Sequence, residues 1–274
     1  MKLSGKTKIT GLFGYPVEHS LSPAMHNAAF EALGLDYCYV AFPVHPDSLK
    51  DAVIAIRAMN LVGVNVTIPH KEKVMGFLDE IDKEASIIGA VNTIVNSSGR
   101  LKGYNTDGRG FMQFLFESGI SVENKEVLIV GAGGASRALT YYLAKEAKKV
   151  YLYDIEKKKA EQLVEDLKNT LTNISSLDNI TKIDDFNVII NATPLGLKEE
   201  DPLPLDTTLL RSDQIVCDLI YKNTRLLKEA AKKECVVLHG LGMLLWQGVF
   251  AFELWTGITP PADIMWDALY KNII

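Results

Sequence analysis

The sequence has few cysteines, and they form no pattern that would pair them or let them hold a metal. There are three, an odd number, and no two of them have CxxC spacing: Cys38, Cys217 and Cys235. This argues against a disulfide framework and predicts reduced, mostly buried thiols. The five histidines also lack HExxH or any other metal spacing, so we expect no metal site.

The chain also lacks an excess of positive charge and a long hydrophobic run. Lys plus Arg number 29 and Asp plus Glu number 34, a formal net charge of −5 over 274 residues. That balance argues against nucleic-acid partners and anionic membrane surfaces. The most apolar stretch, 241–252, is too short to span a bilayer. No sustained apolar segment follows the first lysines as in a signal peptide, so a cytoplasmic location is expected.

Two nucleotide and hydrolase signatures are missing, and a third pattern is present. The sequence has neither a GxSxG elbow nor a GxxxxGK[ST] phosphate loop. Instead, the apolar run 126–130 ends at Gly131, which would permit a tight turn into a helix. Gly133 would let the backbone approach a pyrophosphate at that helix N-terminus. Ser136, in place of a third glycine, is small enough for close packing of helix and strand.

The sequence after this turn favours a dinucleotide-binding sheet over an ordinary strand–turn–helix. A second predicted strand, 149–153, ends at Asp154, near where an acid would reach a ribose hydroxyl. Further strands are predicted at 187–191, 215–219 and 235–238. The polar segment 173–185 is expected to be a loop, and the lysine-rich helix 156–168 a solvated surface.

The first part of the chain also alternates strands with helices, which predicts an α/β fold with a parallel sheet covered on both faces. Strands are expected at 8–14, 37–42 and 62–69, a hairpin at 91–95 and 101–104, and helices at 24–33, 47–59, 82–88 and 109–117, with a further helix beginning at His70 and Lys71. Two helices, 242–255 and 261–270, close the chain.

Four groups of polar residues lie at the carboxyl ends of predicted strands, where open α/β sheets bind ligands. They are Ser20 with Ser22, Asn65 with Thr67 and Lys71, Asn92, and Asn105 with Asp107.

Each group also has a purely structural interpretation. Ser22 precedes a proline and could only cap its helix, and Asp107 could cap the next one. Asn92 could only complete a turn. Lys71 is expected in a first helical turn, where a cation opposes the dipole, which suggests a role beyond folding.

A dinucleotide site together with a polar group containing a lysine and an aspartate indicates hydride transfer coupled to proton transfer. The nicotinamide performs the hydride step, and the protein needs one positioned acid/base group.

Taken together, the polar groups and the glycine turn resemble the shikimate dehydrogenase family over essentially the whole chain. The matching segments are 14–16, 19–23, 65–71, 89–93, 103–108, 131–135, 191–196, 218–221 and 240–243, with Gln247. The resemblance implies two α/β domains flanking an active-site cleft. A split substrate-binding and catalytic domain would comprise 1–108 and 240–274, and a Rossmann-type dinucleotide-binding domain 109–239.

The resemblance also implies reversible reduction of 3-dehydroshikimate to shikimate, with Lys71 and Asp107 as the catalytic pair. Substrate-binding residues would be Ser20, Ser22, Asn65, Thr67, Asn92, Tyr221 and Gln247. Cofactor-binding residues would be Gly131, Ala132, Gly133, Gly134, Ala135, Asp154, Leu219 and Gly242. The expected partners are this small substrate and a nicotinamide dinucleotide, in a monomer or homodimer.

One segment departs from the family pattern. NADP-using members carry Asn-Arg-Thr after the second Rossmann strand, and this sequence has Asp154-Ile155-Glu156. NADP is the family default, but the missing arginine and the added acids argue for NAD. An NAD-dependent quinate/shikimate dehydrogenase is therefore an alternative. A nucleotide-sensing regulator without catalysis is another, although Lys71 and Asp107 together speak against it.

Overall fold

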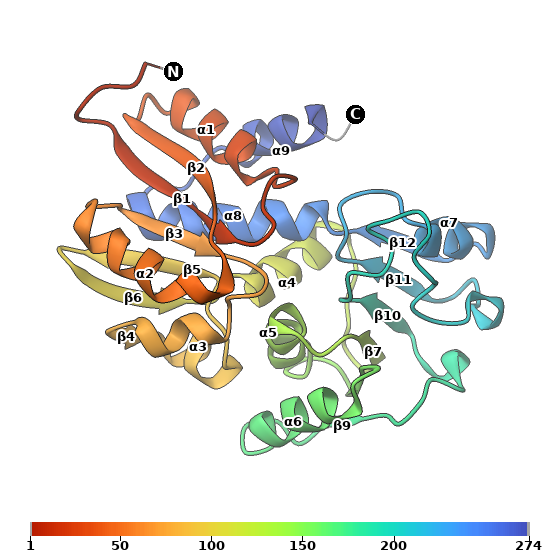
Figure 1. Ribbon diagram of the computed structural model, residues 1–274. Coiled ribbons are helices and arrows are strands. Elements are labelled where there is room, and N and C mark those ends of the chain that lie inside the picture. Colours follow the sequence, from red (N-terminus) through yellow and green to blue (C-terminus); the bar gives the residue numbers. More distant parts are fainter. Residues whose placement is uncertain (1, 273–274) are drawn as a thin grey trace. The chain divides into compact units, whose positions relative to one another are not determined.

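The computed structural model describes residues 2–272 as two compact units, each with its own six-stranded sheet (Figure 1). Unit 1 combines the chain up to Gly110 with the chain from Leu244 onward, and unit 2 is Phe111–Met243. The chain changes unit within α4 (Asp107–Glu117) and within α8 (Leu241–Thr256). The α/β class with a Rossmann-type sheet is confirmed.

Unit 1 contains a mixed sheet with the strand order β2-β1-β3-β5-β6-β4. Its strands are β1 (Lys8–Gly14), β2 (Tyr37–Pro43), β3 (Gly63–Val66), β4 (Glu80–Ile81), β5 (Thr93–Ser97) and β6 (Arg100–Tyr104). β1 pairs in parallel with β2 and β3, as predicted. The predicted hairpin forms as β5 and β6, and β5 is antiparallel to β3, so the whole sheet is not parallel.

Helices cover the sheet of unit 1 on two faces. Their bounds are α1 (Ser22–Ala32), α2 (Leu49–Ala58), α3 (Lys83–Ile88) and α9 (Ala262–Lys271). α2 contributes Leu49, Val53 and Ile56 to a core with Val64 and Val66 of β3. The rings of α1 and α8 instead pack on Tyr39 of β2, so the strand side chains alternate between two cores.

Unit 2 contains an all-parallel sheet in the order β12-β11-β10-β7-β8-β9. The strands are β7 (Glu126–Val130), β8 (Lys149–Tyr153), β9 (Ile174–Ser176), β10 (Val188–Asn191), β11 (Ile215–Asp218) and β12 (Val236–His239), and the helices are α5 (Gly134–Leu143), α6 (Lys157–Leu167) and α7 (Arg225–Lys232). The winding reverses between β7 and β10, the switch point where doubly wound sheets bind ligands.

Three sequence predictions are corrected. β9 and a 3-10 turn (Ile183–Asp185) lie in the segment expected to be a loop. No α-helix begins at Lys71, because its carbonyl accepts a hydrogen bond from the Val91 amide, and a 3-10 helix starts only at Lys73 (Lys73–Phe77). Leu21, not Ser22, is the N-cap of α1, and it makes no side-chain capping bond.

Two expected absences concern the described part of the chain alone. Between residues 2 and 272, none of the helices has both the length and the apolar composition needed to cross a membrane. Over the same residues, no cluster of three or more histidine, cysteine or acidic side chains suits a metal ion.

The core of unit 1 contains a histidine that makes stability depend on pH. His26 is fully buried, and burial lowers the pKa of its ring to about 3 from an ordinary 6.5. Neither ring nitrogen has a hydrogen-bond partner. The ring stacks on Tyr39, with centroids 4.4 Å apart and planes at 11°.

Acid should therefore destabilise the fold through His26. Because its folded-state pKa is the lower one, the unfolded chain takes up the proton first. Stability should fall by about 1.4 kcal/mol per pH unit as the pH drops below about 6.5. In urea unfolding at pH 7.5 and pH 5.0, the unmodified protein should lose about 2 kcal/mol more than His26→Phe, which keeps a stacked ring. Equal losses in the two proteins would contradict this assignment.

Candidate active site

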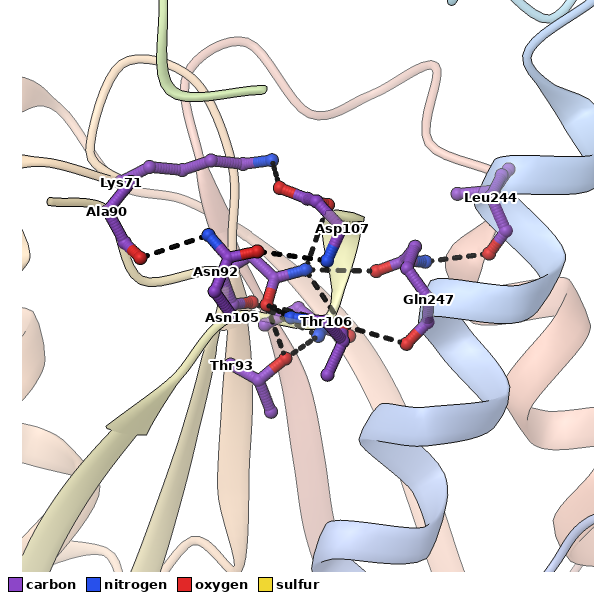
Figure 2. A network of polar contacts seen from close by, with 10 residues as sticks. Lys71, Ala90, Asn92, Thr93, Asn105, Thr106, Asp107, Leu244 and Gln247 are labelled. Atoms are coloured by element: carbon purple, nitrogen blue, oxygen red, sulfur yellow. Dashed lines mark hydrogen bonds and ion pairs between the residues drawn. The ribbon is translucent and has the colours of Figure 1, made fainter. Parts of the chain in front are cut away.

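A lysine and an aspartate from distant parts of the sequence meet in unit 1. Lys71 Nζ lies 2.5 Å from Asp107 Oδ2 (Figure 2). Their side chains are 15% and 5% exposed, so the pair is largely removed from water. At this depth an ion pair is favourable only if the remaining polar atoms are also satisfied. The sequence-predicted catalytic residues are therefore brought together as an ion pair.

The amide of Asn92 supplies the second bond to the aspartate. Its Nδ2 donates to Asp107 Oδ1 and to Thr106 Oγ1, each at 2.9 Å. Its Oδ1 accepts from the Thr106 backbone N–H at 2.8 Å and from Thr93 Oγ1 at 2.9 Å. Asn92 is therefore the hub of a buried polar network, and completing a turn is not its only role.

Hydrogen bonds to backbone groups hold the segments that carry Lys71 and Asp107 next to each other. The Val91 amide donates to the carbonyl of Lys71 at 2.8 Å. Next to it, Asn105 Nδ2 donates to the Ala90 carbonyl at 3.0 Å, while Asn105 Oδ1 accepts from the Asp107 amide at 3.0 Å. One short segment before β5 thus anchors both the lysine and the aspartate.

Gln247 joins the network from helix α8. Its backbone carbonyl accepts from Thr106 Oγ1 at 3.0 Å, and its Oε1 lies 3.5 Å from Asn92 Nδ2 (Figure 2). Its Nε2 donates to the Leu244 carbonyl at 2.7 Å. The last part of the chain is therefore tied to the network around Asn92, and the substrate-binding role of Gln247 stays a prediction.

The remaining predicted substrate residues of unit 1 differ in how exposed their polar groups are. Ser22 is buried, Ser20 and Thr67 are half-buried, and Ser20 Oγ accepts from the Ser22 amide at 3.3 Å. Asn65 is buried, and its amide is bonded within the protein, to Tyr39, Asn92 and Thr93. The contacts of Tyr39 and Thr106 could not be predicted, because neither spacing nor residue type encodes a partner across a sheet.

In unit 2, the predicted dinucleotide turn has the required backbone. Gly131 has φ +105°, which side-chain-bearing residues rarely adopt, and a Cβ there would lie 3.0 Å from the Ala192 carbonyl carbon. Gly133 is the N-cap of α5, and a Cβ there would meet no atom within 4 Å. The turn therefore leaves open space at a helix N-terminus, and the backbone there fits a dinucleotide pyrophosphate.

Asp154, directly after β8, is hydrogen-bonded to the backbone of this turn. Its Oδ2 accepts from the Ala132 amide and its Oδ1 from the Glu156 amide, each at 2.8 Å. Ile155 beside it is 91% exposed. Two of the three lysines that follow are paired with acids: Lys157 Nζ is 2.7 Å from Asp178, and Lys159 Nζ is 2.6 Å from Glu156.

The other predicted cofactor residues are Leu219, directly after β11, and Gly242, the second residue of α8. The Leu219 amide donates to the Asn191 carbonyl at 3.0 Å, and Tyr221 is exposed. Asp218, the last residue of β11, is buried and accepts from Asn191 Nδ2 at 3.1 Å, and burial raises the pKa of its carboxyl. Gly242 is buried, and a Cβ there would clash with the Phe114 ring.

Three family models match consecutive parts of the chain. The shikimate dehydrogenase substrate binding domain matches residues 12–94, and the shikimate/quinate 5-dehydrogenase model matches residues 115–196. The shikimate 5'-dehydrogenase C-terminal domain matches residues 240–270.

Whole-length relatives agree with these matches. The shikimate dehydrogenase (NADP(+)) of Desulforamulus reducens is 47% identical over 284 residues, covering 99% of this chain and 98% of that protein. A solved shikimate dehydrogenase in complex with NADP+ is 44% identical, with a TM-score of 0.93 over 100% of this chain and 98% of its own. The Listeria monocytogenes shikimate 5-dehydrogenase in complex with shikimate and NAD is 40% identical, with a TM-score of 0.87 over 97% of each chain.

Proposed function

The chain belongs to the shikimate dehydrogenase family, and we propose that it interconverts 3-dehydroshikimate and shikimate with a nicotinamide dinucleotide. The observation that carries the proposal is the buried Lys71–Asp107 pair with Asn92 on its second oxygen. Family membership makes the protein an oxidoreductase of this kind. The direction of the reaction, the residue roles and the choice of cofactor are the proposal.

The proposed acid/base group is Lys71. A nicotinamide dinucleotide, when bound, supplies hydride to the ketone carbon or accepts it from the alcohol carbon. Reduction of a ketone leaves an alkoxide oxygen, and Lys71 Nζ has donors to spare for it beside its bond to Asp107. Asp107 holds the ammonium in place, and Asn92 holds Asp107. In the oxidation direction the reverse transfer occurs: the amine that proton donation leaves on Lys71 takes up the hydroxyl proton.

The substrate-binding roles follow the family assignment. Ser20 and Ser22 would donate to the substrate carboxylate, and Thr67, Asn92, Gln247 and Tyr221 would contact its hydroxyls. In this proposal unit 1 supplies the substrate-binding residues except Tyr221, and unit 2 supplies Tyr221 and binds the dinucleotide at residues 131–135 with Asp154, Leu219 and Gly242. The names of the relatives and the solved complex with NADP+ support NADP as a cofactor, and one relative was solved with shikimate and NAD.

Within this proposal we infer that NAD is the preferred cofactor. Asp154 lies at the turn where an adenosine ribose would sit, and no arginine stands beside it. A 2′-phosphate would meet that carboxylate, and at ~4 Å and an effective dielectric near 20 each like-charge pair costs about 4 kcal/mol. Solvent reduces this to about 1–2 kcal/mol at an exposed site. Lys157 and Lys159 are already paired with acids and offset little of it.

The same residues keep an NAD-dependent quinate/shikimate dehydrogenase as a second candidate. Asp154 favours it, and the family model for residues 115–196 covers both substrates. The Ser20 and Ser22 pair favours shikimate. Turnover of quinate against shikimate separates the two, and a regulator without catalysis would turn over neither.

Removing the acid/base group should abolish most of the rate. Lys71→Ala should lower kcat by about 10²–10⁴, the usual contribution of a positioned proton donor, with little change in substrate KM. Lys71→Arg should be nearly as slow, because it keeps the cation beside Asp107 but gives up its proton poorly. Steady-state kinetics checks this, with Lys73→Ala as an exposed lysine control that should stay near normal.

Asp107→Asn should also lower kcat, and combining it with Lys71→Ala should cost little more than either change alone, because the two residues act as one unit. Near-normal kcat in Lys71→Ala would remove the lysine from the mechanism. Equal losses in Lys73→Ala would point to a general effect of charge.

The carboxylate contact should appear in KM. A hydroxyl bond to an anion contributes about 1.5–3 kcal/mol, so Ser22→Ala should raise the shikimate KM by about one to two powers of ten. Because Leu21 and not Ser22 is the N-cap of α1, the free energy of unfolding should barely change. Lost stability with an unchanged KM would instead assign Ser22 a structural role.

Cofactor preference should favour NAD by about tenfold to a hundredfold in kcat/KM, with NADP still used. Ile155→Arg should move the preference toward NADP, because it adds a forked cation without disturbing Asp154. Ile155→Gln changes the same exposed position without charge and should leave the ratio unchanged. An unmodified enzyme that strongly favours NADP would show that the lysines outweigh Asp154.

A further inference from the structure

A buried tyrosine of β2 reaches the polar network from outside the predicted site. Tyr39 is 2% exposed, and its hydroxyl donates to Asn65 Oδ1 at 2.8 Å. β1 lies between β2 and β3, so this bond spans a strand. The tyrosine ring is stacked on His26, and Trp255 lies 6.0 Å away between centroids. The hydroxyl is therefore held in one place by rigid neighbours.

Asn65 connects Tyr39 to β5 through its own hydrogen bonds. It is the Cα partner of Thr93 in the antiparallel pairing of β3 and β5. Its Nδ2 donates to Thr93 Oγ1 at 3.0 Å and to the Asn92 carbonyl at 3.2 Å. With the Tyr39 bond on the oxygen, the amide has an internal partner at each polar atom. The acceptor and donor ends of Asn65 cannot be exchanged without breaking these bonds.

The fixed orientation of the Asn65 amide sets the direction of the hydrogen bond between Thr93 and Asn92. Thr93 Oγ1 accepts from Asn65, and its single hydrogen donates to Asn92 Oδ1 at 2.9 Å. The Asn92 amide group then points its Nδ2 at Asp107 Oδ1. Each donor from Tyr39 onward points to the next residue in this series, and the last one, Asn92 Nδ2, points to the carboxylate that holds Lys71. Hydrogen bonds aligned in this way polarise one another in a low-dielectric interior.

We propose that Tyr39, Asn65 and Thr93 are positioning residues that fix the amide of Asn92 against Asp107. The inference rests on the proposed dehydrogenase function and adds to it the source of the orientation of Asn92. The inference gives Asn65, which the family resemblance places among the substrate-binding residues, a role through its neighbours. The backbone N–H of Thr106 also donates to Asn92 Oδ1. Breaking the series of hydrogen bonds from Tyr39 to Asn92 therefore loosens the side-chain amide of Asn92 without releasing it.

Breaking this series of hydrogen bonds should lower kcat moderately and leave substrate binding nearly unchanged. One lost hydrogen bond of about 1–1.5 kcal/mol corresponds to about a five- to tenfold change in rate. Tyr39→Phe and Thr93→Val each remove one hydroxyl and keep the shape of the side chain. Each should lower kcat by about five- to tenfold and change the shikimate KM by less than about threefold.

Two comparisons separate positioning from general destabilisation. Tyr37→Phe is the matched control on the same strand, because its hydroxyl contacts Lys8 and lies outside the network. It should leave kcat unchanged. Thr93→Ser restores the hydroxyl and should recover most of the rate. Tyr39→Phe added to Thr93→Val should lower kcat little further, because Thr93→Val has already interrupted the series of hydrogen bonds.

The unmodified protein is assayed first with shikimate and either cofactor. No turnover there overturns the proposed function. If it turns over, normal kcat in Tyr39→Phe and Thr93→Val overturns the positioning inference and leaves the function standing. Additive losses in the double variant, failure of Thr93→Ser to recover the rate, or equal losses in Tyr37→Phe would also overturn the inference.

Discussion

The site in unit 1 depends on one interaction, the buried ion pair of Lys71 and Asp107. Removing both charges from water is expensive, and the pair is favourable only when its other polar atoms are bonded. Asn92 satisfies the second carboxylate oxygen, and Asn105 bonds the amide of Asp107. The polar residues around the pair are therefore conditions for its existence at this depth.

The mixed sheet explains why these residues can meet. β3 runs parallel to β1 and ends near Thr67 and Lys71, while β5 runs antiparallel to β3. The amino end of β5, at Asn92, therefore lies at the same edge as the carboxyl end of β3. β6 returns antiparallel to β5 and delivers Asp107 to that edge. A fully parallel sheet would have placed Asn92 at the opposite edge.

Local pattern was enough to predict most strands and helices and the glycine turn. The run 126–130, Gly131 and the helix after it were found because apolar periodicity and positive φ leave a signal in residue type. Other features depend on distant partners. Lys71 is kept out of a helix by the Val91 amide, and β9 is a three-residue strand in a polar segment. The bonds of Asn65 to Tyr39 and Thr93 arise from strand register, which one sequence does not encode locally.

The same dependence on partners governs the cofactor turn in unit 2. Asp154 uses both carboxylate oxygens to hold backbone amides, one of them in the turn itself. An asparagine there would set an N–H against one of those amides, so the charge at this position is also part of the fold. The acid proposed to disfavour a 2′-phosphate can therefore not be removed without disturbing the turn proposed to bind the pyrophosphate. In that proposal, a stronger use of NADP is reached more easily by adding a cation at exposed Ile155 than by losing Asp154.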